Sequence, residues 1–110
     1  MPTVNIYSKD VNKFDSLGEI VEELKELLSI KLTCGEFKLT SKEISVRFIK
    51  IEGGGMIGEV ELEITAAAFK ERVEKQDEIC REVMRWIMEK NKNLGEVKVW
   101  LKLSELGHSW

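Results

Sequence analysis

The second residue of the chain is its only proline, and it stands just before a short run of alternating apolar residues. Pro2 has a structural interpretation, because proline at the first position of a strand sacrifices no hydrogen bond of the sheet. It also has a chemical one. If Met1 were removed, Pro2 would carry an N-terminal secondary amine. Such an amine acts as a general base or nucleophile once burial or neighbouring cations lower its pKa.

Arg47 is the second residue with chemical potential, and it lies within the β-forming segment 44–51. An arginine on a strand can hold a carboxylate through charge-assisted hydrogen bonds. The structural alternative is an ion pair across the sheet with a glutamate of the next predicted strand. The candidates for that pair are Glu59, Glu61 and Glu63.

A glycine run, Gly53-Gly54-Gly55, separates the Arg47 strand from Met56 and Ile57. The run lacks the Lys-Ser/Thr pair of a phosphate-binding loop and opens no helix, so we expect a hairpin turn. An apolar wall containing Met56 would exclude water. Such a wall would keep the pKa of an amine low and strengthen an arginine–carboxylate contact.

The spacing of apolar residues predicts the order strand, helix, strand, strand, helix, strand. Ser16 followed by Glu19 predicts a capping box at the start of the first helix. Residues 32–42 stay open between a small extra strand and a packed loop, because Gly35 interrupts the pattern. The predicted ranges are strand 2–7, helix 16–31, strand 44–51, strand 59–65, helix 70–90 and strand 96–103.

This order predicts a single α+β domain over residues 1–110. It would hold two β-α-β units that form a four-stranded sheet with two helices on one face. Two folds share the order. One is the ferredoxin-like fold, whose strands are antiparallel, and the other is the tautomerase fold. The order alone does not choose between them.

Pro2 and residues 45–59 together resemble the tautomerase superfamily. In 4-oxalocrotonate tautomerase, an arginine on the strand after the first helix binds a substrate carboxylate, and a glycine-containing hairpin with an apolar residue follows. Arg47 matches that arginine, and Met56 or Ile57 matches the apolar residue. The second half resembles 5-carboxymethyl-2-hydroxymuconate isomerase, in which a strand leads through small residues into a helix with an early glutamine, here Gln76.

The resemblance implies a homotrimeric, macrophage migration inhibitory factor-like proton-transfer isomerase. Its substrate would be a small 2-oxo or enol carboxylic acid, with Pro2 as the catalytic base and Arg47 and Met56 binding the substrate. It implies no cofactor and no metal. Many members carry an arginine after the first strand, whereas this chain has Lys9 and Lys13 there. Lys70 or Arg72 occupies a comparable place in the second half. The alternative is a non-catalytic ferredoxin-like or tautomerase-like binding and assembly module.

The composition and charge of the chain disfavour several classes of function and partner. The 110 residues carry a formal net charge of −3, which disfavours nucleic acid as a partner. No apolar run is long enough to predict a membrane span. Two cysteines, Cys34 and Cys80, favour a reducing cytoplasm over a disulfide framework. The single histidine, His108, is poor evidence for a metal site.

Overall fold

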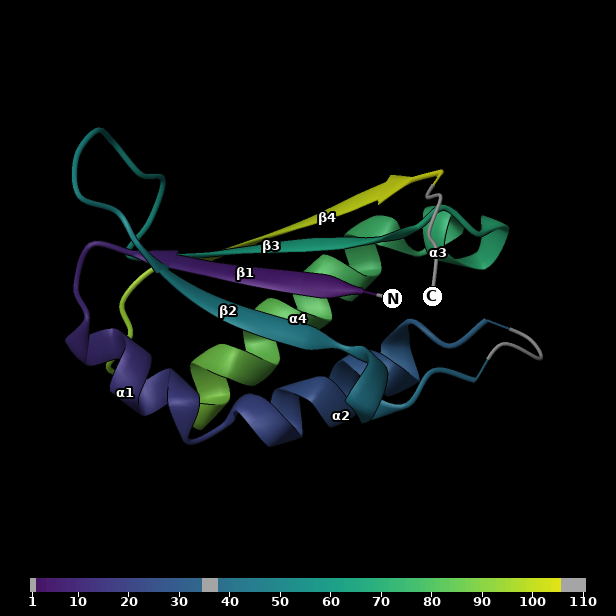
Figure 1. Ribbon diagram of the computed structural model, residues 1–110, viewed down its shortest axis with the longest axis horizontal. Coiled ribbons are helices and arrows are strands. Elements are labelled where there is room, and N and C mark those ends of the chain that lie inside the picture. Colours follow the sequence, from purple (N-terminus) through teal and green to yellow (C-terminus); the bar gives the residue numbers. More distant parts are fainter. Residues whose placement is uncertain (1, 35–37, 106–110) are drawn as a thin grey trace.

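A four-stranded mixed sheet lies at the centre of the computed structural model, which describes residues 2–34 and 38–105. His108 therefore lies outside the described residues. The helices cover one face of the sheet and leave the other face open (Figure 1). The strands, in the spatial order β2-β1-β3-β4, are β1 (Thr3–Ser8), β2 (Ser45–Lys50), β3 (Val60–Ala67) and β4 (Val97–Ser104).

The pairing of the strands decides between the two candidate folds. β1 pairs with β2 in parallel, β3 pairs with β4 in parallel, and the central β1–β3 pair is antiparallel. Each parallel pair is joined by a helical crossover and so forms a complete β-α-β unit. The prediction of two β-α-β units is confirmed. The ferredoxin-like alternative is wrong, because its neighbouring strands would all be antiparallel.

Both predicted helices are interrupted. The first begins earlier than the sequence indicated, because the Asp10 carboxylate accepts a hydrogen bond from the Asn12 N–H at 2.9 Å. Ser16 therefore lies inside a helix, and the predicted capping box is wrong. A capping box forms instead between Thr40 and Glu43, within the segment left open. The helices are α1 (Asn12–Gly18), α2 (Val21–Lys31), the 3-10 turn η1 (Ser41–Glu43), α3 (Lys70–Glu74) and α4 (Gln76–Lys90).

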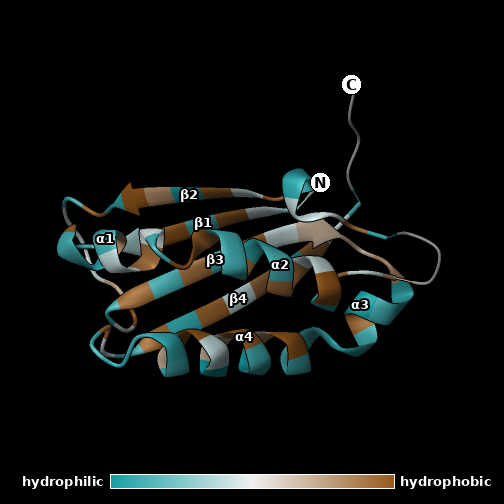
Figure 2. Cartoon of the chain, turned by 90° about the horizontal axis from the view of Figure 1, so that it is seen from below, coloured by the Kyte–Doolittle hydropathy of each residue, from teal (hydrophilic) through white to brown (hydrophobic). Residues whose placement is uncertain are grey.

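The core lies between the sheet and the helices. Every second residue of β1 and β3 is buried in it, and apolar residues of α2 and α4 pack against them. Figure 2 shows α2 and α4 lying over this face of the sheet. Gln76 joins the layers, since its Nε2 donates to the Leu101 carbonyl of β4 at 2.7 Å. None of the helices in the described part of the chain is long and apolar enough to cross a bilayer. Fully buried core residues include Val4, Ile6, Leu24, Leu28, Leu62, Ile64, Val83 and Ile87.

The glycine run does not form a hairpin. β2 and β3 lie on opposite sides of β1, so residues 51–59 must pass across the end of β1. The segment extends beyond the sheet (Figure 1). Gly54, at φ +83°, supplies the left-handed backbone that the turn requires.

Gly95 → Ala is expected to lower the free energy of unfolding by about 1–3 kcal/mol, because Gly95 has φ +79° before β4. A Cβ there would also lie 2.7 Å from Glu59 Cγ. Urea denaturation measures the change. Gly53 → Ala is the matched control, since its Cβ would meet no atom within 4 Å. Equal effects of the two substitutions would contradict the conformational argument.

Candidate functional site

Pro2 lies buried at the end of β1, on the helix-covered face of the sheet together with Val4 and Ile6. Its carbonyl accepts a hydrogen bond from the Ser45 N–H at 3.2 Å. The β1–β3 register, continued by one pair, places Pro2 opposite Ala66. The beginning of β1 lies where α2 ends and α3 begins (Figure 1).

Arg47 lies on the opposite face of the sheet from Pro2. It stands beside Asn5 in the β1–β2 register, and its side chain is exposed. Among the described residues no hydrogen-bond or ion-pair partner of Arg47 is found. The ion-pair alternative is therefore not realised with β3, where Glu63 pairs instead with Lys102 at 3.0 Å.

Met56 lies near the other end of β1. It lines a hollow of about 240 Å³ together with Ser8, Lys9 and Asp10. Six strand residues separate this end from Pro2, a distance of roughly 20 Å. A single chain therefore does not bring Pro2, Arg47 and Met56 together, and a site containing all three needs a second copy.

The structure brings Arg72 to the Pro2 end instead. This side chain is only 5% exposed. Its Nε donates to the Leu32 carbonyl at 2.9 Å, its Nη1 donates to the Ala67 carbonyl at 3.0 Å, and its guanidinium lies 4.7 Å from the Phe69 ring centre. Because Ala67 follows the residue opposite Pro2, the guanidinium lies on the order of 10 Å from Pro2. Lys70, the other sequence candidate, is exposed.

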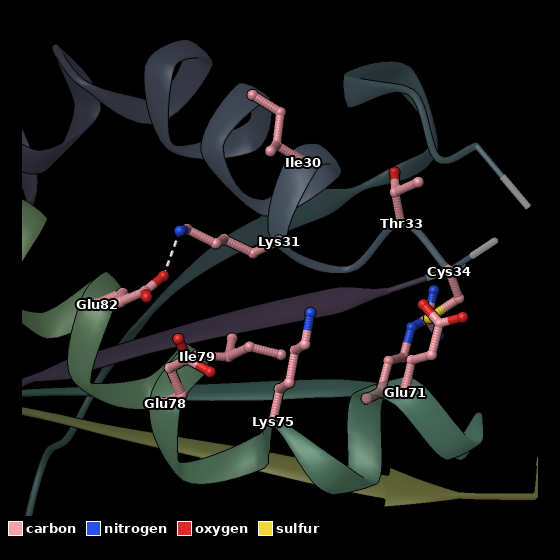
Figure 3. Close-up of a pocket in the computed structure, with 10 residues that line it drawn as sticks. Ile30, Lys31, Thr33, Cys34, Glu71, Lys75, Glu78, Ile79 and Glu82 are labelled. Atoms are coloured by element: carbon pink, nitrogen blue, oxygen red, sulfur yellow. Dashed lines mark ion pairs between the residues drawn. The ribbon is translucent and has the colours of Figure 1, made fainter.

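A cavity of about 230 Å³ opens at this same end, between the end of α2 and the α3–α4 segment. Figure 3 shows Lys31 and Thr33 on one side and Glu71, Lys75 and Glu78 on the other. Lys31 forms an ion pair with Glu82 across the cavity. Cys34, buried and free, and Arg72 also line it. This cavity could not be predicted from the sequence, because its walls come from separate β-α-β units.

The open face of the sheet carries a polar cluster around Glu63. The Glu63 carboxylate accepts hydrogen bonds from Asn5 Nδ2 and the Tyr7 hydroxyl, each at 3.3 Å. The hydrogen bond from Lys102, followed by that from Asn5, lowers the pKa of Glu63. Within the described residues, the Asn5 Oδ1 atom is buried without a hydrogen-bond partner. Trp100, 42% exposed, lies beside the cluster.

This cluster predicts a loss of stability in acid. A carboxyl whose pKa is lowered by folding stabilises the fold above its ordinary pKa, and this contribution disappears as the pH falls through the lowered value. Glu63 → Gln should therefore reduce the loss of stability on acidification, measured as the shift of urea midpoint between neutral and acidic pH. Glu89 → Gln, on the exposed side of α4, should leave that shift unchanged. Identical pH dependence in all three proteins would contradict the expectation.

Comparison with known proteins supports the fold. No sequence-family profile and no curated protein sequence matches the chain. Among solved structures it is similar to a macrophage migration inhibitory factor-like protein from Entamoeba histolytica, with TM-score 0.61 and 16% identity over 98% of this chain and 95% of that one. A 5-carboxymethyl-2-hydroxymuconate delta-isomerase gives TM-score 0.60 and 9% identity, over 100% and 85% of the two chains. A member of the cis-3-chloroacrylic acid dehalogenase family gives 0.57 and 11%, over 94% and 74%.

These similarities show that the chain has a tautomerase-like fold. The matched structures are members of the tautomerase superfamily, and the resemblance that Pro2 and residues 45–59 indicated is confirmed at the level of the fold. Sequence identities of 9–16% extend the similarity no further than the fold. The candidate site residues are therefore argued from the geometry of this chain and not from these similarities.

Proposed function

We propose that this chain is a keto–enol tautomerase acting on a small 2-oxo or enol carboxylic acid, with Pro2 as the base after removal of Met1. The observation that carries the proposal is the position of Pro2. It is buried at the same end of the tautomerase-like sheet as the buried Arg72 and the cavity that Arg72 lines, although Pro2 is not itself a lining residue of that cavity. Burial disfavours the charged form of an amine, so the Pro2 amine would be available as a base near neutral pH.

The proposed reaction is an isomerisation that needs no oxidant, reductant or cofactor. In ketonisation, the Pro2 nitrogen takes the proton of the enol hydroxyl, and the electron pair of the broken O–H bond becomes part of an enolate. The carbonyl forms as the electrons of the enolate double bond take the proton back from the protonated amine, which makes a new C–H bond. A cation at the carboxylate stabilises the negative charge as it develops.

The remaining substrate contacts require a homotrimer in this proposal. Arg47 and Met56 do not reach the Pro2 of their own chain, so they would serve the Pro2 of a neighbouring copy. The open sheet face, with Tyr7, Ile49 and Trp100, is the surface that would pack against neighbours. Aromatic residues are enriched at such interfaces. We place the protein in the cytoplasm, which is supported by the free thiols of Cys34 and Cys80.

Ketonisation of phenylenolpyruvate and of 2-hydroxymuconate, followed by ultraviolet absorbance, tests the proposal. The chain without Met1 should accelerate at least one of these reactions, and kcat/KM should rise with pH as the Pro2 amine loses its proton. If the protein lacking Met1 accelerates neither reaction, the catalytic proposal is wrong. The second candidate, a binding module without catalysis, would then be favoured by the separation of Pro2, Arg47 and Met56 in one chain.

A further inference from the structure

Arg72 is the only charged residue that is buried within residues 2–34 and 38–105. Its hydrogen-bond partners are the carbonyl oxygens of Leu32 and Ala67, which are neutral. Within the same residues, no carboxylate lies within ion-pair distance of it. A buried charge is costly unless an opposite charge accompanies it. The Arg72 guanidinium is therefore a positive charge that the described protein does not neutralise.

The Arg72 guanidinium also has N–H groups that make no hydrogen bond to the described residues. Arginine carries five N–H groups, and the two carbonyls use one on Nε and one on Nη1. Nη2 makes no hydrogen bond to the described residues. Arg72 lines the cavity between the end of α2 and the α3–α4 segment, which we call the α2–α3 cavity. The N–H groups of Arg72 that bond no described residue can meet a ligand in this cavity.

The other charges around the cavity are more exposed than Arg72. Lys31 and Glu82 neutralise one another as an ion pair. Glu71, Lys75 and Glu78 are exposed side chains at the rim. Water screens charges at the rim more strongly than a charge on the floor. The floor is thus electropositive although the lining contains as many acidic as basic residues.

We propose that the α2–α3 cavity binds the carboxylate of a small organic acid, with Arg72 holding the carboxylate on the floor and Lys75 attracting it at the rim. The planar guanidinium suits a carboxylate better than a point charge would, because it can donate two parallel hydrogen bonds. A volume of about 230 Å³ corresponds to roughly seven water molecules, which is enough for an acid of a few carbon atoms.

This inference deepens the proposed function. It rests on that function only for the claim that the bound acid is also the substrate of the reaction. It assigns the anion-binding cation to the same chain as Pro2, whereas Arg47 would come from a neighbouring copy. Binding itself requires neither a free Pro2 amine nor turnover. The site can therefore be tested in protein that retains Met1, where the Pro2 nitrogen is an amide.

A nitrogen-15 NMR titration of the Met1-retaining full chain with sodium pyruvate tests the site, with sodium chloride at equal ionic strength as the reference. Pyruvate should shift the Arg72 Nε–H signal and the backbone amides of Thr33, Cys34 and Glu71. Chloride should shift none of them. Absence of pyruvate-specific shifts at these positions overturns the inference.

Three substitutions should change the affinity for pyruvate in directions that only an anion site predicts. Lys75 → Met should weaken pyruvate binding about two- to fivefold, and Glu71 → Gln should strengthen it by a similar factor, as expected for charges at an exposed rim. Lys92 → Met, at an exposed lysine that follows α4 and lies outside the cavity lining, should leave the dissociation constant unchanged. Weaker binding in Glu71 → Gln together with stronger binding in Lys75 → Met would show that the cavity selects cations, which overturns the inference.

Arg72 → Lys tests the role of Arg72 directly, because lysine keeps the positive charge but cannot donate two parallel hydrogen bonds to a carboxylate. It should weaken pyruvate binding about tenfold or more while the protein still unfolds cooperatively. The two proposals fail separately. Pyruvate binding without any ketonisation by the Met1-free chain would refute the tautomerase and leave this site. Ketonisation whose KM is unchanged by Lys75 → Met and Arg72 → Lys would refute this site and leave the tautomerase.

Discussion

A chain that retains Met1 is expected to show a kcat/KM for ketonisation about 10²–10⁴-fold below that of the same chain without Met1. This is the range that a positioned general base contributes. Retention of Met1 converts the Pro2 amine into an amide, which has no lone pair available for a proton. Fold and assembly serve as internal controls, since circular dichroism and light scattering should not distinguish the two forms. Equal turnover by both forms would exclude the Pro2 amine as the base.

The location of Arg47 adds a second test of the same site. Arg47 → Ala should also lower ketonisation, whereas Arg85 → Ala on the exposed side of α4 should not. Because Pro2 and Arg47 of one chain lie on opposite faces of the sheet, the proposed site combines them from different copies. Trimers reassembled from a mixture of Pro2 → Ala and Arg47 → Ala chains should therefore regain part of the activity. No recovery in mixtures shown to exchange subunits would contradict a shared site.

Trp100 → Glu is expected to convert the proposed trimer into monomers and to reduce ketonisation by at least about 100-fold. Trp100 lies on the open sheet face beside Tyr7 and Glu63, where a neighbouring copy would cover it. Large aromatic residues at the centre of an interface carry much of the binding free energy, and a charge in their place disfavours assembly. Activity should fall with assembly, because a monomer lacks the Arg47 and Met56 of its neighbour.

Met88 → Glu is the matched control for this substitution. Met88 has the same exposure as Trp100, 42%, but lies on α4. Light scattering should report a trimer for the wild type and for Met88 → Glu, and a monomer for Trp100 → Glu. A wild-type protein that is monomeric at high concentration would remove the basis for the trimer.

The alternation of apolar residues predicted the strands well, since a half-buried strand must place every second side chain in the core. The order of the strands in the sheet could not be predicted, because the same sequence of helices and strands fits the strand pairing of both the ferredoxin-like and the tautomerase fold. The breaks at Ile20 and Lys75 were missed, since the apolar periodicity continues on both sides of each break. The hairpin at Gly53–Gly55 was wrongly predicted, because a glycine run reports local turning and not which strands it joins.

The sequence indicated candidate site residues one by one, but it did not indicate how they are arranged in space. Pro2 stands out as the only proline, and its burial agrees with a site at the end of β1. The sequence did not show that Arg47 faces away from it, because that depends on the β1–β2 register. The burial of Arg72 was equally hidden. Its partners Leu32 and Ala67 lie in different β-α-β units, and a surface arginine on a helix would have the same local sequence.

The central claim is that the free amine of Pro2 moves the proton. The most direct test is the intact mass of the protein purified from its native host, measured on the same sample that is assayed for phenylenolpyruvate ketonisation. The account predicts a mass lacking Met1 and turnover that disappears when the Pro2 amine is blocked. A mass that retains Met1, or turnover that survives the blocking of that amine, would contradict it.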